Sequence, residues 1–424
     1  MDGPRSDRRS FLIGSAALAL AGASPDNAPV RVAVVGTGAR GCDLIRALST
    51  VDGAEIAAVC DDYAPHLERG LSYAGPKARG FDDLAKMLKE IAPSALVIAT
   101  PLDRHFAMAV EALEAGCAVL CEKTMCYSID QARELATLVE GRKAVFQVGL
   151  QRRANAIYEQ ALAMVESGML GTISAIECRW HRNNNWRRPV PVPRGDARWE
   201  ALDRRLNWRL YRDSSQGLMS ELASHQLDVA NRLLGGPPKR VIGSGGIDHW
   251  RDGREVFDNV FCIYEYEVGD GAGRRTIRVT YSSIQNNAYE GASELVLGTK
   301  GTLLLTQSKG LFYREGGADD PNWAVREGRV ERDASIITSG KTLKLSNDPW
   351  AHRGKPFEIE STGDDTRAEL VAFIDNVRRK DPATICDARA GLVNAATVLI
   401  GNQAMREGRS VPFPEGLAGR PKRI

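Results

Sequence analysis

Short apolar runs alternate with amphipathic stretches over residues 30–150. Runs of about four to eight apolar residues are typical of buried strands, and apolar positions repeated every three or four residues are typical of helices. Strands and helices that alternate at this length predict parallel βαβ units. The pattern predicts strands that begin at Val30 and span Glu55–Cys60, Ala95–Thr100, Ala118–Glu122 and Ala144–Gly149, with helices over Phe81–Ile91, Arg104–Ala115 and Ile129–Glu140.

A different pattern begins at Ile173, where apolar and polar residues partly alternate along short segments separated by glycine turns. Alternation with a period of two indicates strands with one buried face, so we expect an open, mainly antiparallel sheet here. The fold class is therefore α/β, followed by an α+β domain. Strands are predicted at Ile173–Trp180, Val256–Val268, Arg274–Ser283, Ser293–Leu297 and Thr302–Thr306, and helical patterns return from Arg367 to Met405.

Composition narrows the kinds of partner. The 56 basic and 54 acidic residues nearly balance, so no net field attracts nucleic acid or an anionic membrane surface, and we expect a small-molecule substrate. No run of about 18 apolar residues occurs, so no membrane span is expected. The eight cysteines form no C-x-x-C pair and mostly lie in apolar runs, which favours free core thiols over disulfides, and no metal site is predicted.

The N-terminus resembles a twin-arginine export signal. Arg8 and Arg9 precede an apolar stretch from Phe11 to Ala23, and Ala21-Gly22-Ala23 has the small residues of a cleavage site. A disordered or amphipathic tail is the alternative. Such signals export folded proteins, so we expect a periplasmic or other extracytoplasmic enzyme that carries its cofactor with it.

Glycines 36, 38 and 41 follow the first predicted strand with the spacing G-x-G-x-x-G. They allow a tight turn, close approach of a pyrophosphate, and packing of the next helix on the strand. Asp61 ends the next apolar run, where an acid accepts hydrogen bonds from an adenosine ribose. This predicts a Rossmann dinucleotide site, with a structural glycine turn as the alternative. The cofactor-binding residues predicted are Gly36, Thr37, Gly38, Ala39, Arg40, Gly41 and Asp61, with Thr100, Pro101, His105, Glu122 and Lys123 at the ends of later strands.

Asp61 is followed by Asp62, and this pair would repel a 2′-phosphate. We therefore predict NAD as the cofactor, while Arg40 keeps NADP open. The predicted segments are a signal peptide at 1–29, a Rossmann NAD(P)-binding domain at 30–150, a substrate-binding α+β sheet domain at 151–365, and C-terminal helices and a tail at 366–424.

Residues 217–235 have the periodicity of one helix closed by glycines. Glu221, His225 and Asp228 share a polar stripe on it with Arg232, opposite an apolar stripe. Periodicity alone describes an ordinary amphipathic helix. A catalytic stripe is the alternative.

The run from Trp180 to Arg188 combines tryptophans, amides and guanidinium groups, which suit a sugar or its carboxylate. A solvated loop with its tryptophans packed inward is the alternative. The predicted substrate-binding residues are Trp180, Asn184, Trp186, Arg187 and Asp228. Arg204, Arg205, Arg209 and Arg212 are expected on a solvated, salt-bridged face.

Several motifs in this order resemble the Gfo/Idh/MocA family of glucose-fructose oxidoreductases and inositol dehydrogenases over nearly the whole mature chain. They are G-T-G-A-R-G at 36–41, A-T-P at 99–101 with His105, C-E-K-T at 121–124 and F-Q-V-G-L-Q-R-R at 146–153. The resemblance implies that Lys123 lies at the nicotinamide, although Thr124 replaces the usual proline. It also implies catalytic roles for Glu221 and His225, which match the family's Asp-x-x-x-His with a longer acid.

The resemblance implies an NAD(P)-dependent oxidoreductase acting on a hydroxyl of a sugar, sugar derivative or cyclitol. His225 would remove the hydroxyl proton, Lys123 would stabilise the alkoxide, and Glu221 would orient or share protons with His225. Outside the cytoplasm the cofactor would be retained and recycled in the site. An NAD-dependent glycoside hydrolase or lyase using transient oxidation is one alternative, and a non-catalytic nucleotide-binding sensor is another. A homo-oligomer formed through the open sheet is also expected.

Overall fold

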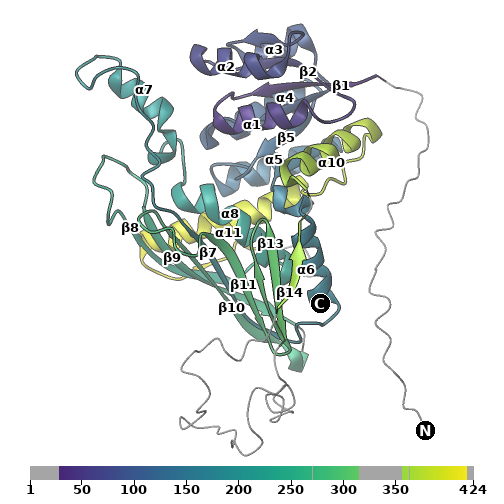
Figure 1. The fold of residues 1–424 in the computed structure, drawn as a ribbon, viewed down its shortest axis with the longest axis vertical. Helices are drawn as coiled ribbons and strands as arrows, with labels where there is room; N and C mark the ends of the chain where they lie inside the picture. Colours follow the sequence, from purple (N-terminus) through teal and green to yellow (C-terminus); the bar gives the residue numbers. More distant parts are fainter. Residues whose placement is uncertain (1–27, 270, 315–355, 362, 418–424) are drawn as a thin grey trace, which may run out of the picture.

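The computed structural model describes residues 28–269, 271–314, 356–361 and 363–417. The predicted export signal lies outside these residues. Among the helices described, none is long and apolar enough to cross a membrane. In Figure 1 a domain built on a parallel sheet lies above a domain built on a larger sheet, and the chain from residue 356 onward contributes elements to both domains.

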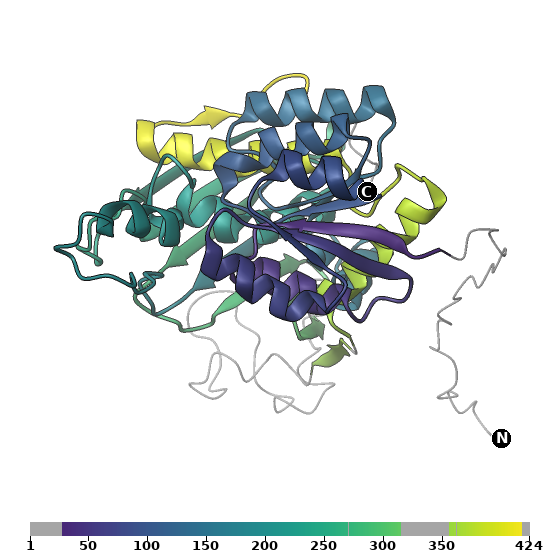
Figure 2. The same cartoon turned by 90° about the horizontal axis from the view of Figure 1, so that it is seen from above.

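The first domain has a six-stranded parallel sheet in the order β3-β2-β1-β4-β5-β6. Figure 2 shows helices on both faces of this sheet, which is why its strands are almost continuously apolar. The Rossmann prediction is therefore confirmed. The strands are β1 (Val30–Val35), β2 (Ala54–Cys60), β3 (Arg79–Phe81), β4 (Ala95–Ile98), β5 (Ala118–Glu122) and β6 (Phe146–Gly149), and the helices are α1 (Ala39–Leu48), α2 (Ala64–Ala74), α3 (Leu84–Ile91), α4 (His105–Glu114) and α5 (Ile129–Arg142).

The second domain has a nine-stranded sheet in the order β14-β13-β12-β11-β7-β10-β9-β8-β15, in which the described pairs are antiparallel except β7 with β10. The prediction of an open, mainly antiparallel sheet is confirmed. Its strands are β7 (Ile173–His181), β8 (Arg240–Gly246), β9 (Asn259–Val268), β10 (Arg275–Ile284), β11 (Ala292–Gly298), β12 (Gly301–Leu305), β13 (Lys309–Arg314), β14 (Phe357–Glu360) and β15 (Val411–Pro412).

Helices cover one face of this sheet. Buried residues alternate with more exposed ones along the strands, so that β9 buries Cys262, Tyr264 and Tyr266. The covering helices are α6 (Ala156–Glu166), α8 (Ser224–Leu233) and α11 (Ala388–Glu407). Helix α10 (Asp365–Arg379) instead packs into the core of the first domain through Leu370 and Phe373, so the C-terminal helices join the two domains.

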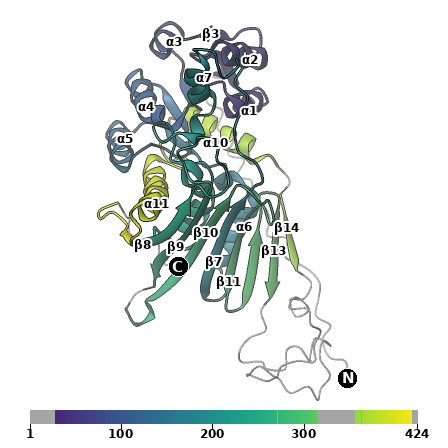
Figure 3. The ribbon, with the colours of Figure 1, turned by 90° about the vertical axis from the view of Figure 1, so that its left-hand side faces the viewer.

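After β7 and a loop of residues 182–188, a long arm of residues 189–217 leaves the second domain and carries α7 (Trp199–Leu206). Figures 1 and 3 show α7 beside the first domain rather than over the large sheet. Arg205 on this helix pairs with Asp62 at 2.7 Å and lies 5.8 Å from the Tyr63 ring centroid. The arm therefore spans the cleft between the domains.

All eight cysteines are buried and none forms a disulfide, as the sequence predicts. In the part of the chain that the structure describes, no group of three or more His, Cys, Asp and Glu side chains is arranged to hold a metal.

Candidate active site

The glycine loop between β1 and α1 has the geometry that a dinucleotide requires. Gly36 has φ +86°, and a Cβ there would lie 2.6 Å from the Ala99 carbonyl oxygen. A Cβ on Gly41 would lie 1.8 Å from the Gly36 oxygen, so α1 can pack against the loop only through glycine. At Gly38 a Cβ would meet nothing within 4 Å, and the backbone faces open space at the start of α1. A phosphate can approach that backbone and the helix N-terminus.

Asp61, which follows β2, holds the loop as well as facing the cleft. Its Oδ2 accepts hydrogen bonds from the Thr37 backbone at 2.7 Å and hydroxyl at 3.2 Å, and its Oδ1 accepts one from the Tyr63 backbone at 3.0 Å. Burial would raise the pKa of Asp61, but His66 and these backbone donors lower it. Asp61 is therefore a carboxylate that fixes Thr37 while lining the cleft.

Lys123 lies directly after β5 and is placed by its neighbours. Its Nζ donates to the Glu221 carbonyl oxygen at 3.0 Å, and its backbone N–H donates to Glu122 Oε2 at 3.1 Å. The Lys123–Thr124 peptide bond is cis. Burial lowers the pKa of Lys123, opposed by the charges of Glu221 and Glu122. An ammonium has three donors, so two stay available for a substrate oxygen.

Arg40 joins this lysine segment to the glycine loop and to α10. Its Nε lies 2.6 Å from Glu122 Oε1, and its Nη2 lies 3.9 Å from Oε2 of Glu369. Burial disfavours both carboxylates. The charges of Arg40 and Lys123 nevertheless lower the pKa of Glu122, whereas the pKa of Glu369 is raised well above its usual range by burial and by Glu122. Arg40 therefore pairs mainly with Glu122.

The strand-end residues Thr100 and Pro101 also lie in the cleft, as predicted. His105 is buried, and its ring nitrogens lie 3.0 Å from the Thr124 oxygen and 3.1 Å from the Thr100 oxygen. Burial lowers its pKa. His105 thus ties the ends of β4 and β5 together.

The predicted helix at 217–235 is α8 preceded by a π-helical turn, Met219–Ala223. Such turns often lie at functional sites. Here the turn contains Glu221, and His225 follows it at the start of α8. His225 is 6% exposed, and its Nδ1 has no hydrogen-bond partner among the described residues. Burial and the nearby charges of Lys123 and Arg152 hold its pKa well below the usual value, so the ring is a neutral proton acceptor.

Two expectations about charged side chains need correction. Glu221 Oε2 accepts a hydrogen bond from Arg209 Nε at 2.8 Å, and no bond joins Glu221 to His225 within the described residues. Arg209, expected on a solvated face, lines the cavity instead, because the arm turns the 3₁₀ helix Trp208–Leu210 inward. Arg204 lies on an exposed, salt-bridged surface as predicted, and Arg212 is exposed, with its Nε donating to the Glu255 carbonyl oxygen at 2.7 Å.

Two cavities meet in the cleft. One, of about 370 Å³, contains Lys123, Glu221 and His225. The other, of about 700 Å³, lies by the glycine loop and Asp61 and is lined on its far side by the arm. Both are lined by Ala99, Thr100 and Trp208, so together they offer an extended site. The smaller cavity is also lined by Ala39, Arg40, Gln151, Trp180, Arg182, Trp186, Arg188 and Asn207.

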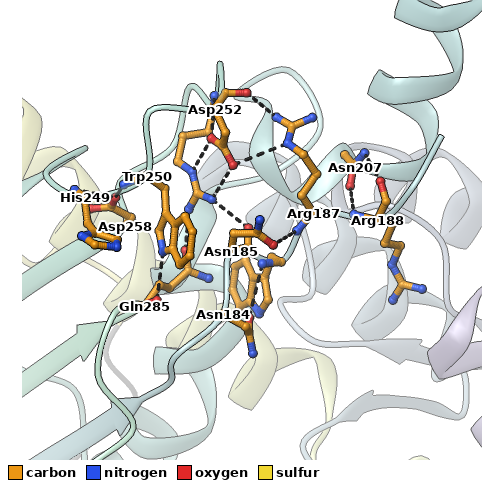
Figure 4. A network of polar contacts seen from close by, with 12 residues as sticks. Asn184, Asn185, Arg187, Arg188, Asn207, His249, Trp250, Asp252, Asp258 and Gln285 are labelled. Carbon is orange, nitrogen blue, oxygen red and sulfur yellow. Dashed lines mark hydrogen bonds and ion pairs between the residues drawn. The ribbon is translucent and has the colours of Figure 1, made fainter. Parts of the chain in front are cut away.

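The structure separates the predicted substrate-binding residues. Trp180 and Trp186 line the cavity, and the Trp180 ring lies 5.6 Å from that of His225. Arg187 instead pairs with the buried Asp203 at 2.7 Å and with Asp252, and Asn184 caps its own loop by accepting from the Trp186 N–H. Figure 4 shows Arg187 directed toward Asp252.

Asp228 likewise does not line the cavity. It forms a two-point ion pair with Arg153, with distances of 2.7 and 2.8 Å. Sequence reasoning missed Arg182, Arg188, Trp208 and Arg209. The run of Trp180 to Arg188 carried a signal for the first two, but only the partners of Arg187 show which arginine is engaged elsewhere. Nothing local marks Trp208 or Arg209, because a long-range fold of the arm places them.

Two family models match the chain. A model of an oxidoreductase family with an NAD-binding Rossmann fold matches residues 30–150, and a model of the C-terminal alpha/beta domain of the same family, Gfo/Idh/MocA, matches residues 163–413. Together they cover most of the chain.

Individual relatives agree with this. An inositol 2-dehydrogenase 1 of Saccharopolyspora erythraea is 33% identical over 292 residues, which is 68% of this chain and 78% of that protein. An uncharacterized oxidoreductase of Streptococcus pneumoniae is 26% identical over 91% of this chain and 99% of its own length. The crystal structure of the WlbA dehydrogenase from Bordetella pertussis, in complex with NADH and UDP-GlcNAcA, has a TM-score of 0.64 at 22% identity and covers 91% of this chain and 99% of that one.

Proposed function

Because this chain belongs to the Gfo/Idh/MocA family of NAD-binding oxidoreductases, we propose that it oxidises a hydroxyl of a sugar, sugar derivative or cyclitol and recycles its cofactor in the site. One observation carries the proposal. The ammonium of Lys123 and the neutral ring of His225 line a single cavity that continues into the glycine-loop cavity.

The residues present fit a nicotinamide adenine dinucleotide. The open backbone at Gly38 accommodates a pyrophosphate, and Asp61 presents a carboxylate in the adjoining cavity. The smaller cavity leaves space beside Lys123 and His225 for the nicotinamide and a substrate. When bound, the cofactor supplies the carbon that accepts a hydride.

The side chains divide the remaining chemistry. His225 accepts the hydroxyl proton, because burial keeps it neutral at neutral pH. Lys123 stabilises the developing alkoxide with the donors that Glu221 does not use. Glu221 acts as a positioning residue, since its carbonyl oxygen holds Lys123 and its carboxylate holds Arg209.

Substitution of each group tests these roles. Removing a general acid or base typically costs roughly 10²- to 10⁴-fold, so Lys123→Ala and His225→Ala should each lose turnover on that scale while retaining nucleotide. His249→Ala is the matched control, because His249 is exposed and does not line the cavity. Turnover within threefold of wild type in either active-site variant would remove that residue from the mechanism.

The arm supports the proposal that the cofactor is retained. Ala201, Arg204 and Arg205 line the larger cavity opposite Gly36 and Gly38, so the arm covers the side on which the glycine loop lies. The Arg205–Asp62 contact borders this cavity, so its opening would ease the exit of a nucleotide bound there. Retention would require that each hydride be handed to a second substrate or returned to the first one.

Return of the hydride to the first substrate is the chemistry of the alternative, an NAD-dependent glycoside hydrolase or lyase. Product analysis separates the two functions. A stable keto product indicates the dehydrogenase, whereas a released aglycone without net redox change indicates the cleaving enzyme. A non-catalytic sensor would show neither product, and it would not require Lys123 and His225 in one cavity.

We also propose export, on the twin-arginine pattern at Arg8 and Arg9. Replacing both by lysine should leave a folded, nucleotide-loaded protein in the cytoplasm, since recognition depends on the arginine pair. Extracytoplasmic protein at wild-type levels would contradict this route.

A homo-oligomer formed through the open sheet is the last element proposed. Ile242, Phe261 and Ile263 are 45%, 53% and 38% exposed on neighbouring strands β8 and β9, on the face that the helices leave uncovered. Light scattering of Phe261→Glu against wild type tests it, and an unchanged molar mass would contradict it.

A further inference from the structure

Three guanidinium groups of the second domain converge on the cavity that contains Lys123 and His225. Arg182 follows β7, Arg188 ends the adjoining loop, and Arg209 comes from the arm. Arg209 is paired with Glu221. Among the described residues, the guanidinium groups of Arg182 and Arg188 have no carboxylate partner. Burial, and then repulsion from Arg209, lower the pKa of Arg188, and the same two influences act on Arg182.

The charges that line this cavity do not balance. Five basic side chains face three acidic ones there, and each acid already has a partner. Glu122 is held by Arg40, Glu221 by Arg209, and Asp43 by Arg46 outside the cavity. His225 adds no positive charge because it is neutral. Arg182 and Arg188 therefore contribute an excess of positive charge on the substrate side of the cavity.

The surrounding loop holds these arginines in place. The Arg182 guanidinium carbon lies 4.9 Å from the Trp180 ring centroid and 5.8 Å from that of Trp186, so it is sandwiched by cation–π contacts. The backbone of Arg188 is bonded in both directions to the Asn207 side chain, at 2.5 and 3.1 Å. Trp186 has φ +61°, a conformation that a bulky residue keeps only when its surroundings impose it.

The network in Figure 4 supplies those surroundings. Arg254 donates to the Asn185 carbonyl oxygen at 2.7 Å and to Asp252, and Asp252 in turn pairs with Arg187. Figure 4 shows the guanidinium groups of Arg187 and Arg188 pointing in different directions. The neighbouring arginine is thus used to fix the loop, and Arg188 is left free to bind.

We propose that the substrate carries an acidic group, a carboxylate or a phosphate, which Arg182 and Arg188 bind while a hydroxyl faces Lys123 and His225. Guanidinium groups bind both anions through paired hydrogen bonds, and one such group would offset part of the excess positive charge. This inference rests on the proposed function, of which it specifies the substrate class.

Binding to nucleotide-loaded protein tests the inference without requiring turnover. Matched pairs of probes are titrated calorimetrically, namely glucuronate against glucose, galacturonate against galactose, and gluconate against glucitol, with glucose 6-phosphate to separate phosphate from carboxylate. We expect at least one acidic probe to bind tenfold or more tightly than its neutral partner. Arg182→Ala and Arg188→Ala should each remove that preference and leave bound nucleotide unchanged, whereas the control Arg198→Ala, on the exposed part of the arm, should retain it.

Equal affinity within every pair would overturn the inference, even if a neutral compound proved to be oxidised. Loss of nucleotide from Arg182→Ala or Arg188→Ala, with the acid preference unchanged, would also overturn it, because the arginines would then serve the cofactor phosphates. Acid preference without hydride transfer from any probe to the cofactor would leave the inference standing and count against the proposed redox function.

Discussion

The ion pair between Arg153 and Asp228 indicates that Asp228 stabilises the fold and does not bind substrate. Arg153 lies in the 3₁₀ helix Gln151–Ala154 after β6, and Asp228 lies on α8. Their two contacts measure 2.7 and 2.8 Å, and a third donor of Arg153 bonds the Ile385 carbonyl oxygen at 3.0 Å. The side chains are only 15% and 3% exposed, so the pair links the domain junction to the helix that carries His225.

Asp228→Asn removes the charge and keeps the shape. Removing one partner of a buried pair costs about 3 to 5 kcal/mol, because the other charge is left buried without compensation. A domain of about 250 residues unfolds with an entropy of roughly 0.5 kcal/mol/K, so the loss corresponds to about 6 to 10 °C in Tm. Calorimetry at saturating nucleotide measures it. The double variant Arg153→Met with Asp228→Leu should recover most of the loss, because it leaves no unpaired charge.

The same variant tests the substrate role predicted from the sequence. If Asp228→Asn kept Tm within about 1 °C of wild type and raised KM more than tenfold, the ion pair would be incidental and Asp228 would contact substrate. We expect the opposite, a large loss of Tm with an unchanged KM for the folded enzyme.

Three further outcomes are expected. Arg205→Ala should speed nucleotide dissociation by up to about fivefold, since an exposed pair is worth at most about 1 kcal/mol, and Arg198→Ala should not, as stopped-flow release would show. Because the pKa of His225 lies well below its usual value, kcat/KM should stay constant as pH falls through 6.5, and a decline centred there would refute its neutral state. The pKa of Glu369 is raised in the folded protein, so the protein loses stability as pH rises through that pKa. Glu369→Gln lacks this loss, and its free energy of unfolding should therefore increase relative to wild type between pH 5 and pH 8. Urea denaturation at both pH values measures this difference, and an equal difference at the two pH values would contradict the prediction.

Local signals located the glycine loop and most strands and helices of the first domain, although helix α2 was not predicted. The spacing of the glycines is enough to predict the loop conformation, because Gly36 needs a positive φ and Gly41 cannot carry a Cβ against the Gly36 oxygen. Strands buried on both faces are apolar throughout, so their runs are visible in the sequence. Short strands such as β3 and β15 escaped notice, since three or two residues carry no periodicity.

Long-range packing explains the failures in the second domain. The sequence places Glu221, His225 and Asp228 on one polar stripe, but periodicity does not say what packs against each turn. The first two meet Lys123 and the cavity, and Asp228 meets Arg153, which comes from a segment 75 residues earlier. The arm shows the same limit. Its arginines look alike in the sequence, but Arg209 lines the cavity whereas Arg204 lies on the exposed surface.

The positive cavity has a consequence for the strength of the base. The pKa of His225 is depressed by burial and then by cations, Arg182 among them. A base works best when its pKa is near the working pH, so a strongly depressed histidine is a weak base for a neutral substrate. An acidic group bound by Arg182 would offset part of that positive field and raise the pKa of His225 in the complex.

The proposed substrate charge and the proposed base are therefore coupled, and pH profiles can show it. The profile of kcat/KM reports the free enzyme, and that of kcat reports the complex. With an acidic substrate, the apparent pKa of the base should be higher in the kcat profile than in the kcat/KM profile. Arg182→Ala should bring the two values together, because it removes both the depressing charge and the bound anion. Equal values in the wild-type enzyme would show that the substrate carries no charge close enough to His225 to change its basicity.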